Sequence, residues 1–244
     1  MGAPELERPA FYALRAGGWR DLITLLHPPY TAWHLSYVAL GAAAAPALHG
    51  DRLAAALGAF FLGVGVCAHA LDELNGRPLG TALSDRTLVA LAAVGLAGAV
   101  GIGVAGAIVV SVQLAPLVAA GGFIVVAYNL ELFGGRFHSD TWFAVAWGAF
   151  PAFTGYWVNA LTLRPAGVLV TAACWALSVA QRRLSTPARE LRRRTVALHG
   201  DQQLADGRRV ELSAQTLAAP LEGALSALSI AMVLLAAGFV AVRS

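Results

Sequence analysis

The feature that most constrains this chain is an uncharged, strongly apolar block at residues 88–130. A helix of about 20 residues crosses a hydrocarbon core of about 30 Å, so the block is too long for one crossing and predicts two. We expect the chain to turn near the glycines of residues 98–106, because glycine weakens a helix. Such a block is typical of a membrane protein.

The composition agrees with this prediction. The chain is 58% hydrophobic and 13% charged, whereas soluble domains are about one-quarter charged. Mean hydropathy is +0.66. Together with the central block, the apolar runs predict an all-α membrane protein with about seven transmembrane helices and one membrane domain over residues 1–244. The further runs are residues 30–48, 53–71, 142–160, 166–180 and 221–242.

The positive charges predict an orientation. All 17 fixed positive charges are arginines. If the N-terminus is cytoplasmic and the spans alternate, only Arg52, Arg164 and Arg243 lie outside, as expected from the enrichment of Lys and Arg in cytoplasmic loops. We therefore expect an integral protein of the inner or plasma membrane. Residues 1–20 do not resemble a cleaved signal peptide, so the first span should direct insertion. The basic balance belongs to loops, and no nucleic-acid partner is expected.

One sizeable polar segment, residues 181–220, lies between the sixth and seventh spans. Its arginine-rich start, residues 182–194, predicts a helix or extension against anionic lipid headgroups. Residues 195–199 and 209–212 flank Asp206-Gly207, a strong turn signal. We expect a small cytoplasmic β-hairpin inserted there.

A first polar cluster ends the second span. His69, Asp72 and Glu73 are spaced to share one helix face, and the turn after them carries Asn75 and Arg77. Ionisable groups in a membrane helix are costly and are functional candidates by default. The cluster would bind metal or move protons. Alternatively, its charges are solvated loop groups at the interface.

A second cluster surrounds the turn between the fourth and fifth spans. We expect the two clusters to converge in one cavity, because carboxylates and imidazoles bind divalent cations while arginines hold anionic oxygens. Alternatively, Ser139 or Asp140 only caps the fifth helix. The candidate catalytic residues are His69, Asp72, Glu73 and Glu131; the substrate-binding residues are Asn75, Arg77, Tyr128, Asn129 and Arg136; the metal ligands are His69, Asp72, Glu73, Glu131, His138 and Asp140.

The remaining histidines and the cysteines carry weaker signals. His34, Tyr37 and Tyr128 lie inside spans, where they either line a cavity or form hydrogen bonds between helices. Cys67 and Cys174 are isolated in apolar runs, which favours small buried hydrophobic residues. His27, His49 and His199 are interpreted as loop residues.

Two stretches resemble the UbiA-type intramembrane prenyltransferase superfamily, whose members transfer or cyclise isoprenoid chains. Residues 68–83 resemble the family's first acidic loop and the Arg-Pro-Leu that follows it. Residues 128–131 and 147–157 resemble a tyrosine-bearing end of the fourth helix and a Gly-Ala-x-Pro-x-x-x-Gly fifth helix. The resemblance covers roughly residues 20–182 and implies a helical bundle that binds a prenyl diphosphate with Mg²⁺.

The chain also departs from that family. The Asn-Asp-x-x-Asp motif is reduced to Asp72 and Glu73, the second acidic loop lacks the family's spacing, and the family has nine helices. The leading hypothesis is a UbiA-like protein acting on an isoprenoid or other apolar substrate, with membrane lipid around it. A rival is a redox or hydrolytic enzyme with Fe or Zn, because imidazole suits these metals better than Mg²⁺. A third hypothesis is a non-catalytic protein that binds a lipid or a partner.

Overall fold

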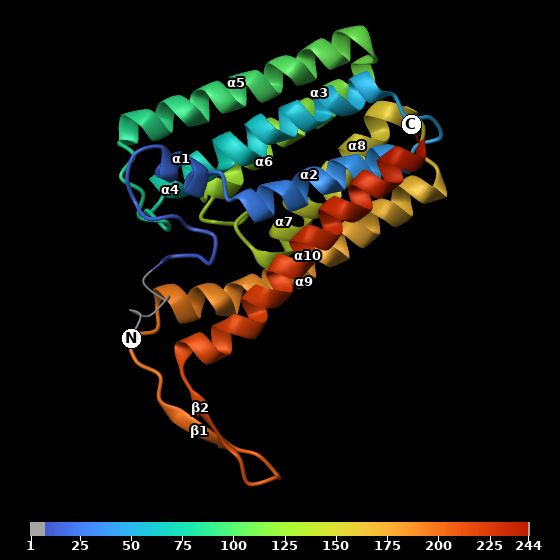
Figure 1. Cartoon of the computed structure of the whole chain (residues 1–244). Coiled ribbons are helices and arrows are strands. Elements are labelled where there is room, and N and C mark those ends of the chain that lie inside the picture. The colour runs from blue at the N-terminus through green and yellow to red at the C-terminus, as the bar shows by residue number, and fades with distance from the viewer. Residues whose placement is uncertain (1–7, 244) are drawn as a thin grey trace.

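The computed structural model describes residues 8–243, which form a bundle of long helices (Figure 1). Within this range, four helices are long and apolar enough to cross a membrane. The first is continuous through α3 (Gly50–Phe60), the π-helical segment η2 (Phe61–Ala68) and α4 (His69–Leu74). The others are α5 (Asp85–Val109), the helix from Val112 to Asn129 containing α6 (Ala115–Asn129), and α10 (Ala214–Arg243). The chain is therefore a helical protein of membrane-like composition.

Further helical segments complete the bundle. They are α1 (Trp19–Leu25), α2 (Pro28–Ala43), α7 (Asp140–Ala144) with the π-helical η4 (Val145–Ala149) and α8 (Phe150–Ala160), and α9 (Pro165–Arg193). Local signals set their starts. Pro28 and Pro165 occupy first turns, where proline is favoured. The hydroxyl of Ser139 accepts a hydrogen bond from the Trp142 N–H at 3.3 Å and caps α7.

The turn inside the central apolar block lies at Val110 and Ser111, so the expected turn within residues 98–106 is wrong. The glycines serve packing instead. A Cβ on Gly95 would lie 2.7 Å from the Leu62 carbonyl oxygen, and one on Gly103 would lie 2.6 Å from a Val118 methyl. The break comes where the Ser111 hydroxyl caps the short 3-10 helix η3 (Val112–Leu114), just before a proline in the first turn of α6.

Two other predicted boundaries are also corrected. Helix α2, predicted as the apolar run of residues 30–48, ends at Ala43, because Pro46 disfavours helix just before it. The sixth predicted helix extends to Arg193 and not only to residue 180, so most of the arginine-rich stretch continues the helix. Beyond it, β1 (Gly200–Gln203) pairs antiparallel with β2 (Arg209–Leu212), with Gly200 opposite Leu212, so the first strand follows the predicted residues 195–199 and does not include them. In Figure 1 these strands project from the end of the bundle where α9 ends.

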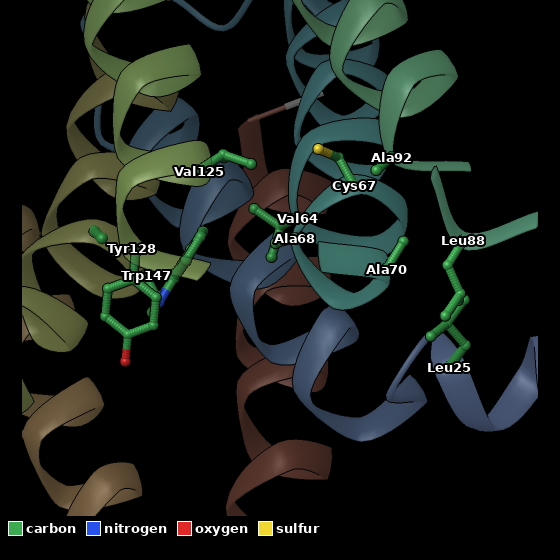
Figure 2. Packing of buried hydrophobic residues seen from close by; sticks show 11 residues of the cluster. Leu25, Val64, Cys67, Ala68, Ala70, Leu88, Ala92, Val125, Tyr128 and Trp147 are labelled. Atoms are coloured by element: carbon green, nitrogen blue, oxygen red, sulfur yellow. The ribbon is translucent and has the colours of Figure 1, made fainter. Parts of the chain in front are cut away.

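The packed core nearest the polar clusters lies between η2, α5, α6 and η4. Figure 2 shows Val64 and Ala68 of η2 on the side of Tyr128 and Trp147, while Cys67 lies beside α5. Cys67 and Cys174 are both buried free thiols. This core supports the helix ends that carry the polar side chains.

Candidate functional site

A cavity of about 350 Å³, here called the polar cavity, lies where α4, α6 and α9 bring their polar residues together. Both predicted clusters contribute to its wall. The predicted site residues that line it are His69, Asp72, Tyr128, Asn129 and His138. The Asn75 amide donates to the Asn129 carbonyl oxygen at 3.3 Å and so joins the ends of α4 and α6.

Glu73 does not line the polar cavity. Its fully buried carboxylate accepts hydrogen bonds from the Leu79 N–H at 2.9 Å, the Thr81 N–H at 2.8 Å and the Thr81 hydroxyl at 2.9 Å. These bonds hold the turn after α4 against the helix. Glu73 therefore has a structural position.

Asn75 and four other predicted site residues also lie outside the cavity lining. Arg77 pairs with Asp85 and donates to the Leu83 carbonyl oxygen at 2.6 Å, which secures the loop before α5. Glu131 and Arg136 are exposed. Asp140 is exposed and accepts from Arg182 Nε at 2.7 Å. The expected role of Arg77 and Arg136, to hold an anionic head group, is therefore not supported by their placement outside the lining.

The donor set does not fit the predicted metal centre. Among the six proposed ligands, Glu73 is directed to a turn and Asp140 to an ion pair with Arg182, while the exposed Glu131 has its Oε1 3.9 Å from His138 Nδ1. Across residues 8–243, no three His, Cys, Asp or Glu side chains are grouped so that they could hold a metal ion. We therefore derive no chemical step through a protein-held metal.

Three imidazoles of the polar cavity have defined tautomers. Nδ1 faces a backbone carbonyl oxygen in His34 (Trp147, 2.7 Å), His69 (Gly65, 3.1 Å) and His138 (Tyr128, 3.0 Å). A carbonyl oxygen only accepts, so Nδ1 carries a proton in each ring, and in the neutral form Nε2 is the acceptor. Two of these carbonyls belong to η2 and η4, and π-helical segments are frequent at functional sites.

His27 is a cavity residue that was interpreted from the sequence only as a loop residue. Its ring stacks near that of His69, with centroids 4.0 Å apart, and its backbone is left-handed at φ 45°. Such a conformation is uncommon for a residue other than glycine and is found at functional sites. Burial, with a smaller effect of His69, lowers the pKa of His27 well below its usual 6.5, so the ring is neutral at pH 7. In the sequence, the His-Pro-Pro stretch was the feature that could have indicated a fixed position for His27 at the start of α2.

The cations of the cavity come from the last part of α9. Arg182, Arg189, Arg193 and Arg194 line it, whereas the sequence interpretation directed this run toward lipid headgroups. The first three recur at intervals close to whole helical turns, which places them on one face. That spacing could have identified them. Against them, only Asp72 and Glu190 supply carboxylates to the lining.

A second cavity, here called the apolar cavity, has a volume of about 160 Å³ and lies between α3, α5, α6 and α8. Its walls include Phe60, Gly122 and Phe150, and it reaches Arg52 near the start of α3. Val64 and Trp147 line both cavities, so the two adjoin at these side chains.

The fold and cavities thus define a helical protein with apolar candidate spans and a cationic cavity at one end. No protein-family model, curated protein or solved structure matches this chain.

Proposed function

We propose that this chain is a UbiA-like membrane enzyme that transfers or cyclises an isoprenoid supplied as a prenyl diphosphate. In this proposal α2, the α7 to α8 helix and α9 cross the membrane together with the four apolar helices, which gives seven crossings. The diphosphate occupies the polar cavity, and the isoprenoid chain occupies the apolar cavity.

The observation that carries the proposal is the junction of the two cavities at Val64 and Trp147. From Val64 back to Arg52 the helix rises about 18 Å, at 1.5 Å per residue. The lining over this length is almost entirely apolar. Each methylene group buried there contributes about 0.8 kcal/mol, so a long chain would add much to binding. A molecule with a charged head and an apolar tail matches both compartments.

The side chains at the junction also suit cleavage of a carbon–oxygen bond to diphosphate. The arginines of α9 would stabilise the negative charge that develops on the leaving diphosphate. The rings of Tyr128 and Trp147 lie 5.4 Å apart, and their π-faces would stabilise an allylic cation. The alternative enzyme with Fe or Zn loses support because the required ligand group does not form in residues 8–243.

A matched pair of glycine substitutions tests the chain compartment. Gly122 lines the apolar cavity, and an added Cβ would be 3.7 Å from a Val100 methyl, so Gly122→Leu should fill the cavity without a backbone clash. Gly101→Leu is the control, because Gly101 is exposed with no other atom within 4 Å of an added Cβ. Affinity for prenyl diphosphates of increasing chain length is measured by calorimetry on protein in nanodiscs.

We expect Gly122→Leu to weaken binding of the longest chain about tenfold, equivalent to losing roughly two buried methylene groups, and to leave the shortest unaffected. Equal affinities for short and long chains in the unsubstituted protein would refute the assignment of the apolar cavity. Release of inorganic diphosphate on adding an acceptor extract measures the reaction itself. Tight binding without release would identify a non-catalytic isoprenoid-binding protein.

A further inference from the structure

The polar cavity holds more positive than negative charge. Four arginines line it, and its carboxylates are those of Asp72 and Glu190. Two of the arginines already have partners, since Arg182 pairs with Asp140 and Arg193 donates to the Pro9 carbonyl oxygen at 2.9 Å. These partners fix the guanidinium groups at the cavity wall. They neutralise only one of the four charges.

Arg189 is the central member of this group. It donates to the Ser185 carbonyl oxygen at 3.3 Å and the Thr186 hydroxyl at 3.4 Å, both on its own helix. Within residues 8–243 it forms no salt bridge at 4 Å or less. Burial, reinforced by Arg182 and Arg193, lowers the pKa of Arg189 below its usual range. A half-buried guanidinium beside like charges is an energetic cost that an anion would remove.

The polar cavity has few carboxylates for a metal-mediated alternative: among the described residues its lining holds those of Asp72 and of the exposed Glu190, and no three potential ligands are grouped there. Mg²⁺ binds phosphate in proteins with one or more carboxylates held in near-octahedral geometry. The buried Glu73 is committed to the turn at Leu79 and Thr81, and Asp140 is committed to Arg182 at the surface. Direct contact with arginine neutralises a diphosphate without a metal ion, because guanidinium groups bind phosphate oxygens bidentately.

We infer that the polar cavity binds a diphosphate head group directly through Arg189, with Arg182 and Arg193 beside it, and needs no divalent metal ion to do so. The inference rests on the proposed function for the nature of the head group. It deepens that proposal by replacing a metal bridge with a guanidinium cluster.

The test uses inorganic diphosphate, which has no isoprenoid chain. The full-length protein in nanodiscs is titrated calorimetrically in low salt with EDTA present, and again with Mg²⁺ in place of EDTA. The variant is Arg189→Gln. The matched control is Arg183→Gln, because Arg183 lies on the same helix but is exposed and outside the cavity lining.

We expect the unsubstituted protein to bind diphosphate in EDTA. Arg189→Gln should weaken binding about tenfold to a hundredfold, the effect of losing a charge-assisted hydrogen bond, while Arg183→Gln changes it less than threefold. Should Arg189→Gln fail to give a monodisperse protein, Arg189→Lys is used instead. Lysine keeps the positive charge but cannot bind phosphate bidentately, so it should weaken binding by a smaller factor.

Binding that is lost in EDTA and restored by Mg²⁺ would overturn the inference, as would equal affinities in the Arg189 and Arg183 variants. The two proposals fail separately. If diphosphate binds in EDTA but an attached prenyl chain adds no affinity, the guanidinium site stands and the isoprenoid function fails. If a prenyl chain adds affinity only when Mg²⁺ is present, the function stands and the metal-free site fails.

Discussion

At the scale of single residues, Glu73 determines how the chain leaves the second apolar helix. Its carboxylate accepts three hydrogen bonds from Leu79 and Thr81 in a site with no solvent exposure. Glu73→Gln places an amide N–H₂ against a backbone donor, so we expect the free energy of unfolding to fall by about 1.5–3 kcal/mol. Thermal unfolding in detergent measures the loss.

The same variant separates a structural role from a role in binding. Glu73→Gln should retain diphosphate binding at temperatures where it is folded, because Glu73 lies outside the polar cavity. Glu211→Gln is the control for stability, because Glu211 is exposed and outside the polar cavity, so this substitution should change the unfolding temperature little. A Glu73 variant of unchanged stability that no longer binds diphosphate would contradict this assignment.

Residue types and helical spacing placed His69 and Asp72 in the cavity correctly, yet they also placed Glu73 there. The three side chains share one helix face, but different parts of the chain cover them. The turn after α4 folds back onto Glu73, and helical periodicity carries no information about that return. The spacing of Arg182, Arg189 and Arg193 indicated a shared helix face, but that this face lines the cavity depends on how α9 packs against distant helices.

At the scale of elements, glycines allow α2 and α8 to pack closely against each other. A Cβ on Gly155 would lie 2.1 Å from the Val38 carbonyl oxygen, and one on Gly41 would lie 1.9 Å from that of Ala152. Gly155→Ala should therefore separate the helices and cost about 1–3 kcal/mol or more, as overpacking does. Chemical denaturation of the purified protein would measure the change.

Gly223→Ala in α10 is the matched control, because no other atom lies within 4 Å of an added Cβ there. It should be neutral or slightly stabilising, since alanine favours helix over glycine. Similar destabilisation by both variants would mean that the close approach of α2 and α8 contributes nothing specific.

Apolar runs in the sequence located the helical segments well, because hydrophobicity over about 20 residues is a strong signal. The ends were less accurate. In residues 88–130 glycine had two readings, as a helix breaker or as a surface for close packing. The second applies at Gly95 and Gly103, and the choice depends on which helix lies opposite.

At the scale of the whole molecule, the arginines divide between the two ends of the bundle. Arg52 donates to the Val158 carbonyl oxygen at 3.2 Å and Arg243 donates to that of Ala45 at 2.6 Å, at the end where Arg164 begins α9. We expect this end to face away from the cytoplasm. A membrane-impermeant thiol reagent on intact cells should label a cysteine at position 164 but not one at position 136. Labelling of both or only of position 136 would require another topology.

The bond between His34 and Trp147 joins residues 113 positions apart in the chain. The ribosome therefore completes α2 long before the acceptor of His34 or the carbonyl groups opposite Gly41 exist. Until η4 and α8 are synthesised, the surface of α2 that makes these contacts stays uncovered. A chain whose synthesis stops before η4 would present that surface to the proteases that survey unfinished membrane proteins.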